Sequence, residues 1–163
     1  MSSSLRIRRS LFDRLLGAHQ DVPDGVMPTY TLDQLRDAVA ADLERLLNTR
    51  TALHADSEAL GPHARRSVLS FGVRDFASRV LTSSEDQRHI ARSLTQAIER
   101  HEPRLRHVNV DFRLDASTGT ALQFTVRAML VVTPLKEGVS FDAVLMPAAS
   151  RYHVTQSRFM HAA

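Results

Sequence analysis

Three consecutive residues, Glu102, Pro103 and Arg104, combine opposite charges with a rigid backbone. Pro103 fixes its own φ, removes a backbone donor and disfavours a helical conformation at the residue before it. The two charged side chains therefore flank a turn. Two interpretations follow: a helix-to-strand turn closed by a surface ion pair worth about 0–1 kcal/mol, or a fixed pair of charges that is presented to a partner.

Glycoside hydrolysis is the enzymatic chemistry to weigh here, because it needs two carboxylates about 5–9.5 Å apart across a cleft. Glu102 is one candidate; Asp75, Glu99 and Asp111 are candidates for the second, and the sequence singles out no pair. A neighbouring Arg stabilises the ionised carboxylate, which is the opposite of what a general acid needs. The chain also has no Trp for sugar stacking. We therefore predict no catalytic residue and no enzyme.

The composition narrows the function classes further. The 163 residues contain no Cys, which excludes disulfides, thiolate metal sites and a Cys nucleophile. The six glycines are scattered and form no phosphate-binding loop, and the His residues show no metal-ligand spacing. We expect no cofactor and no metal site. No run approaches 18 apolar residues, so we expect no membrane insertion.

The 21 basic residues are nearly all Arg, with Lys136 as the sole Lys. Most of the arginines alternate with acids, as in Arg36-Asp37 and Arg74-Asp75. This pattern is typical of a solvated surface of mixed charge rather than of a nucleic-acid-binding face. We predict no nucleic-acid partner.

The residues that flank Pro103 define the elements that position the charged pair. Upstream, apolar residues recur at helical spacing, and Ser84 with Gln87 forms a capping box, so we predict a helix over about 85–102. Downstream, apolar and polar residues alternate, which predicts a strand over 106–115. Two further alternating runs, 120–133 and 139–146, follow hairpin signals.

The N-terminal half is predicted to be helical. Thr31 and Gln34 form a capping box before a strong apolar stripe, which predicts a helix over about 32–47. Pro62 precedes a second, short helix over 63–69. Gly72 stands between apolar residues and predicts a backbone position with positive φ or close packing.

The fold class that follows is α+β, with N-terminal helices packed on a small C-terminal antiparallel three-stranded meander. We divide the chain into a flexible basic arm, short helix and linker (1–28), one α+β domain (29–148) and a loose tail (149–163). The arm carries an apolar ridge that docks on its own domain or on a neighbour, formed by Leu11, Phe12, Leu15 and Leu16. The meander leaves two free edges, and a free edge invites strand addition from another chain.

Four segments in sequence order resemble one family over about residues 10–146. They are Ser10-Leu11-Phe12-Asp13-Arg14-Leu15, Leu46-Leu47-Asn48-Thr49-Arg50, Ser67-Val68-Leu69-Ser70-Phe71-Gly72 with Asp75-Phe76, and Ile98 to Leu105. The chain is similar to TssE, the type VI secretion baseplate family within the phage-tail baseplate wedge proteins that are often labelled "lysozyme-like". It departs from the family at Ser70-Phe71, where Asn-Tyr is more frequent.

The resemblance implies a cytoplasmic structural protein of the baseplate wedge. It implies TssF and TssG as neighbours, and a part in starting polymerisation of the TssB/TssC contractile sheath. The family's Glu-Pro-Arg signature, here Glu102, Pro103 and Arg104, is implied in these contacts. Two alternatives remain: a peptidoglycan hydrolase acting through Glu102, as the label would imply, and an adaptor that binds one regulatory partner.

Overall fold

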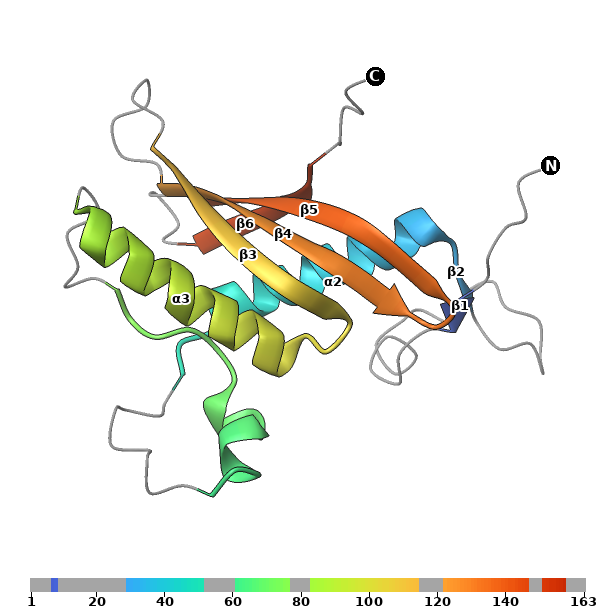
Figure 1. Ribbon diagram of the computed structural model, residues 1–163, viewed down its shortest axis with the longest axis horizontal. Helices are drawn as coiled ribbons and strands as arrows, with labels where there is room; N and C mark the ends of the chain where they lie inside the picture. Colours follow the sequence, from blue (N-terminus) through green and yellow to red (C-terminus); the bar gives the residue numbers. More distant parts are fainter. Residues whose placement is uncertain are drawn as a thin grey trace. The chain divides into compact units, whose positions relative to one another are not determined.

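A computed structural model describes residues 7–8, 29–51, 61–76, 83–114, 122–146 and 151–157 (Figure 1). The chain divides into two compact units, residues 1–39 and 40–163. Helix α2 (Leu32–Asn48) begins in the first unit and ends in the second.

The first unit contains a two-stranded antiparallel pair, in which β1 (Ile7–Arg8) lies beside β2 (Thr29–Tyr30). The expectation of a flexible arm is therefore wrong at Ile7–Arg8, because the backbone there pairs with a second strand. After β2, Thr31 donates its N–H to Gln34 Oε1 at 3.0 Å, and Gln34 donates its N–H to Thr31 Oγ1 at 3.3 Å. This is the predicted capping box, and the helix predicted over 32–47 is confirmed. The apolar ridge of the arm lies outside the described residues.

The second unit is built on an antiparallel sheet with the strand order β3-β4-β5-β6. The strands are β3 (Leu105–Leu114), β4 (Leu122–Val132), β5 (Leu135–Met146) and β6 (Arg151–Gln156). The α+β class and the antiparallel meander are confirmed, but the sheet has four strands rather than three. Strand β5 also begins earlier than predicted, because the β4–β5 ladder continues to the pair Val132 and Leu135.

The fourth strand lies in the stretch predicted to be a loose tail, so that prediction is wrong for residues 151–156. Tyr152 and Val154 are buried, whereas Arg151, His153 and Thr155 between and beside them are exposed. This alternation is the strand period. Burial of two apolar side chains and pairing with β5 stabilise a strand that only six residues form.

The register of the sheet separates an apolar face from a polar face. Cross-strand partners share a face, and one row places Val110, Val126 and Phe141 side by side, all buried. On the opposite face, Thr125 donates its hydroxyl to Asp142 Oδ1 at 2.7 Å. The apolar face carries the core of this unit.

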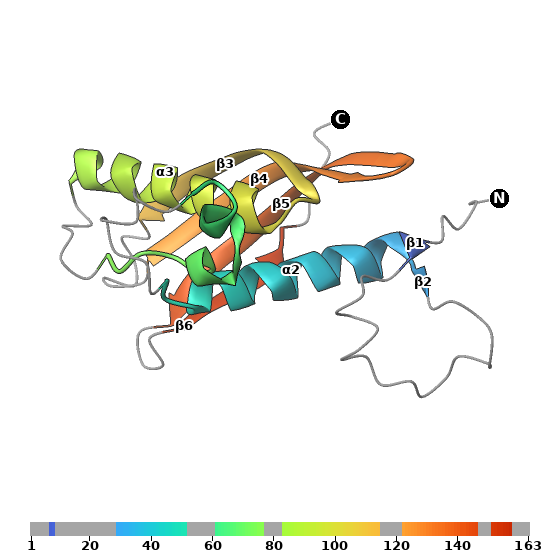
Figure 2. The same cartoon turned by 90° about the horizontal axis from the view of Figure 1, so that it is seen from below.

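Helix α3 (Ser84–His101) and the C-terminal half of α2 cover the same face of the sheet, with α3 beside β3 and α2 beside β6 (Figure 2). The N-cap of α3 is Ser83, whose hydroxyl accepts from the Asp86 N–H at 3.4 Å. The cap is therefore one residue earlier than the predicted Ser84. The buried side of α3 follows the predicted stripe: Ile90, Leu94, Ala97 and Ile98.

Two short 3₁₀ turns, η2 (Ala64–Arg66) and η3 (Val68–Ser70), replace the single helix predicted over 63–69. Gly72 follows with φ +113°, and a Cβ built there lies 2.5 Å from the carbonyl oxygen of Thr49. The close approach exists because Val73 donates its N–H to that same oxygen at 2.8 Å. Both properties predicted for Gly72, positive φ and close packing, are confirmed.

Replacing Gly72 by Ala should therefore lower the free energy of unfolding by about 2 kcal/mol or more, because a Cβ meets backbone atoms and the φ disfavours an L residue. Gly138→Ala is the matched control: nothing lies within 4 Å of its Cβ position, and the change should stay within about 0.5 kcal/mol. Urea denaturation of both variants measures the difference. Equal stabilities would contradict the packing described at Gly72.

Candidate functional site

The Glu-Pro-Arg corner, which we define as Glu102, Pro103 and Arg104, joins α3 to β3. Glu102 is the C-cap of α3; its backbone leaves the helical region, while its N–H still donates to the Ile98 carbonyl oxygen at 2.8 Å. The Glu102 carbonyl oxygen accepts from the Leu105 N–H at 3.0 Å. The chain thus turns within three residues from the helix into the strand, as the position of Pro103 predicted.

The carboxylate of Glu102 is bound by Arg104 on both oxygens. The guanidinium Nε lies 2.7 Å from Oε1, and Nη2 lies 2.5 Å from Oε2. The Arg104 backbone N–H also donates to Oε1 at 3.2 Å. Glu102 is only 5% exposed. The predicted ion pair exists, but it is not the solvated surface pair of the simpler interpretation.

Asp42 on α2 completes the network. Its Oδ2 lies 2.5 Å from Arg104 Nη2, and its other carboxylate oxygen binds Arg45. Burial alone lowers the pKa of the Arg104 guanidinium, but the hydrogen bonds and negative charges of Glu102 and Asp42 outweigh it and raise the pKa. One guanidinium therefore links the corner to α2. Sequence reasoning missed Asp42, which is 62 residues away and carries no local signal.

His101 is the last residue of α3, and it contacts η3 and the residue that follows η3. Its Nε2 lies 2.9 Å from the Ser70 carbonyl oxygen, and its ring meets that of Phe71 edge-on at 5.4 Å between centroids. A bond to a carbonyl requires an N–H at Nε2. Burial lowers the pKa of His101, the bond to Ser70 partly opposes this, and the charge of Arg100 lowers it further.

The outer edge of β6 is capped by side chains of α2. The Tyr152 N–H donates to Asn48 Oδ1 at 2.8 Å, and Asn48 Nδ2 donates back to the Tyr152 carbonyl oxygen at 2.9 Å. Two residues on, the Val154 N–H donates to Glu44 Oε2 at 2.9 Å. These bonds take the place of a neighbouring strand, so this edge of the sheet is closed at Tyr152 and Val154.

Two of the carboxylates considered as partners of Glu102, Asp111 and Glu99, lie in surroundings that differ from its buried site. Asp111 lies on the polar face of the sheet and pairs with Arg127, and Glu99 is exposed on α3. Both oxygens of Glu102 are already bound by Arg104. Within the described ranges, no three His, Asp or Glu side chains gather as a metal site, and no helix there is long and apolar enough to cross a membrane.

A comparison with known families gives a match over residues 33–135 to the baseplate wedge protein gp25 family. The chain belongs to the gp25 family. The matched region begins in the first turn of α2, contains the whole Glu-Pro-Arg corner and ends at the start of β5. The family predicted from the sequence is thereby confirmed. It is a family of structural components of the baseplate wedge.

No curated protein sequence matches the chain. Among solved structures, a chain described as "the baseplate complex from the type VI secretion system" is similar, with a TM-score of 0.47 and 16% sequence identity. The similarity covers 70% of this chain and 96% of that chain. The family assignment rests on the gp25 match alone.

Truncating Arg104 to Ala should lower the free energy of unfolding by about 3 kcal/mol, because it leaves the buried carboxylate of Glu102 without its partner. Arg127→Ala removes an exposed pair with Asp111 and should cost less than about 1 kcal/mol. Urea denaturation measures the free energy of unfolding of both variants and of the wild-type protein. If both variants lose the same small amount, Glu102 is not a buried charge that depends on Arg104.

The lowered pKa of His101 predicts a pH dependence of stability. The folded state favours neutral His101, so its contribution is present above the ordinary pKa of about 6.5 and is lost as the pH falls through the folded pKa. Between about pH 7.5 and about pH 5.5, the wild-type protein should lose more free energy of unfolding than His101→Gln. If both proteins lost the same free energy of unfolding over this pH range, the folded state would not favour the neutral form of His101.

Proposed function

We propose that this gp25-family chain is a TssE-type subunit of a type VI secretion baseplate, the cytoplasmic part of a contractile phage-tail-like machine. In this role it links the baseplate wedge, through TssF and TssG, to the TssB/TssC sheath and helps to start sheath polymerisation. The observation that carries the proposal is the family match across α2, α3 and the corner. The four segments that resemble TssE in the sequence add to it.

The Glu-Pro-Arg corner is the partner-binding site in this proposal. Glu102 is buried, so its role is to hold and orient the Arg104 guanidinium rather than to contact a partner alone. Pro103 is exposed, and the Arg104 side chain is 21% exposed. A partner carboxylate or backbone carbonyl that reaches the remaining guanidinium surface forms a charge-assisted hydrogen bond in a fixed direction.

A second part of the proposal is strand addition by the first sheath subunit at an edge of the sheet. The edge at β6 is partly closed by Asn48 and Glu44, which makes β3 the better template. In the part of the chain that the structure describes, no side chain caps the outer edge of β3 in this way. The apolar ridge of the arm, Leu11, Phe12, Leu15 and Leu16, is proposed to dock on a wedge neighbour.

The hydrogen bonds that the Glu102 carboxylate accepts favour a structural role over hydrolysis. A general acid must direct a free O–H at the leaving group of its substrate. Both oxygens of Glu102 instead accept from Arg104, and a second carboxylate on Asp42 competes for the same guanidinium. This arrangement is suited to holding a cation in place.

Affinity isolation from the native cells tests the proposal. The tagged wild-type protein should bring down TssF, TssG and the sheath proteins, and cells that lack the protein should not form sheaths. Arg104→Lys, which keeps the charge but loses the bidentate fork, should reduce sheath formation, whereas the matched surface variant Arg127→Lys should not. Folded fractions of both variants are compared by circular dichroism.

A one-to-one complex with a single regulator, or recovery of cell-wall fragments alone, would contradict the baseplate role. Normal sheath formation in a folded Arg104→Lys variant would remove the corner from the proposed contacts and leave the family assignment intact.

A further inference from the structure

Three arginines from different segments line one pocket at the end of α3. They are Arg66 of η2, Arg100 in the last turn of α3 and Arg106 near the start of β3. The pocket has a volume of about 490 Å³, and among the described residues Leu105, His107 and Glu99 also line it. We call it the arginine pocket. Its described lining residues contribute three guanidinium groups and one carboxylate, and this excess of positive charge makes the pocket electropositive.

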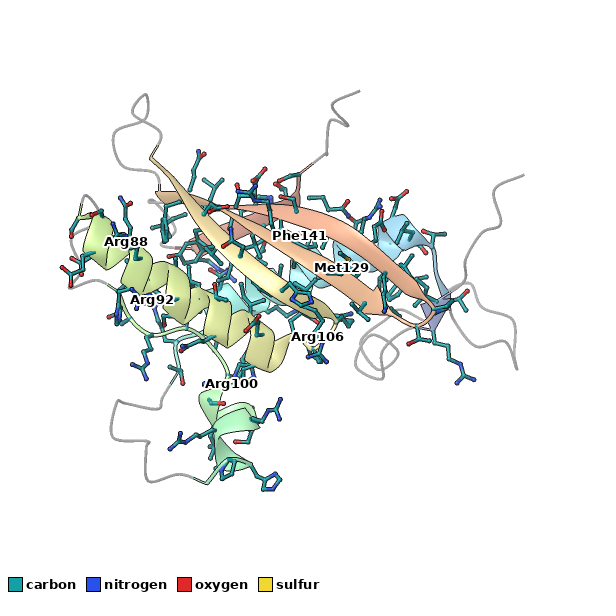
Figure 3. All side chains as sticks on the ribbon, in the orientation of Figure 1. Arg88, Arg92, Arg100, Arg106, Met129 and Phe141 are labelled. Carbon is teal, nitrogen blue, oxygen red and sulfur yellow. The ribbon has the colours of Figure 1, made fainter. Side chains whose placement is uncertain are left out.

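The arginines of the pocket differ from three other arginines of the chain in having no carboxylate partner among the described residues. Arg45, Arg104 and Arg127 each bind a carboxylate. None of the three arginine side chains of the pocket forms an ion pair or a hydrogen bond with another described residue. Figure 3 shows Arg100 at the last turn of α3 and Arg106 at the start of β3, and both line the pocket. Guanidinium groups that line one pocket and are bound by no described carboxylate favour an anionic ligand.

A β-bulge builds one side of the pocket. The β3–β4 register shifts between Arg106 and Asn109, and His107 there has φ +53°. In a regular strand, Arg106 and His107 would point to opposite faces. The bulge breaks this alternation, and both residues line the pocket. Bulges of this kind re-aim side chains beside functional sites.

An exposed apolar pair lies on the turn that follows Arg66 of the pocket. Val68 and Leu69 of η3 are 84% and 56% exposed, and they follow Arg66 within three residues. The turn that displays them is held in place: the Leu69 N–H donates to Ser67 Oγ at 3.2 Å, and Ser70 is bonded to His101 of α3. Large apolar side chains on a fixed turn are typical of a protein contact.

We propose that the arginine pocket and the Val68–Leu69 pair form one docking surface for an acidic segment of a partner protein. Carboxylates of the segment enter the pocket and pair with Arg66, Arg100 and Arg106, while an apolar side chain of the segment packs on Val68 and Leu69. We propose an acidic segment because its charge is complementary to the arginines of the pocket. The exposed apolar pair favours a protein over a nucleic acid as the partner. The inference goes beyond the proposed function, which concerns the corner, the ridge and the edge of β3.

Fluorescence anisotropy with the full-length protein tests this surface. The probe is a fluorescein-labelled peptide of Asp and Glu around a central Leu-Leu pair; a peptide with Lys for each acid and an oligothymidylate are the comparison ligands. The acidic peptide should bind, and its affinity should fall as salt rises. Arg66→Glu with Arg100→Glu should weaken binding by about tenfold or more, and Leu69→Ser should weaken it as well.

The matched control is Arg88→Glu with Arg92→Glu, which makes the same charge change on exposed residues of α3 outside the pocket (Figure 3). It should alter the affinity by less than about threefold. Equal weakening by both double variants would overturn the proposal in favour of a net-charge effect. Tighter binding of the oligothymidylate, unaffected by Leu69→Ser, would overturn it in favour of nucleic acid. Thermal melts confirm that the variants are folded.

Discussion

The buried carboxylate of Glu102 is the group on which the second unit depends. An ionised carboxylate without a partner costs several kcal/mol to bury, so the fold must supply a cation where α3 ends. Arg104 supplies it from the same turn, and Asp42 Oδ2 binds the same Nη2 nitrogen that Glu102 Oε2 binds. Because the three groups come from α2, α3 and the start of β3, satisfying one charge also connects these elements.

Helix α2, which carries Asp42, also closes the β6 edge of the sheet. Glu44 and Asn48 lie two and six residues after Asp42, and they bind the outer backbone groups of β6. The C-terminal half of α2 is therefore held by polar contacts to the corner and to the last strand, with Leu43, Leu46 and Leu47 buried between them. Among the described residues, no side chain caps the outer edge of β3 in the same way, and we therefore propose strand addition at that edge.

Features that depend on neighbouring residues could be predicted from the sequence, while features that join distant residues could not. The capping box at Thr31 and the strained position at Gly72 carry local signals, and both were predicted correctly. Asp42, the strand β6 and the arginine pocket depend on contacts between separate segments. The alternation of arginines with acids indicated a mixed surface, but folding brings Arg66, Arg100 and Arg106 together with one Glu among the described residues of the pocket. The bulge at His107 gives no sequence signal, since its position is set by pairing with β4.

A double-mutant cycle between Asp42 and Arg104 tests most directly whether the Arg104 guanidinium links α2 to the corner. It is measured by urea denaturation of the wild-type protein, Asp42→Ala, Arg104→Ala and the double variant. We expect a coupling energy of about 1–3 kcal/mol, because the network joins α2 to the corner through these two side chains. A coupling energy near zero would show that the corner and α2 are held independently, and it would contradict the role assigned to Arg104.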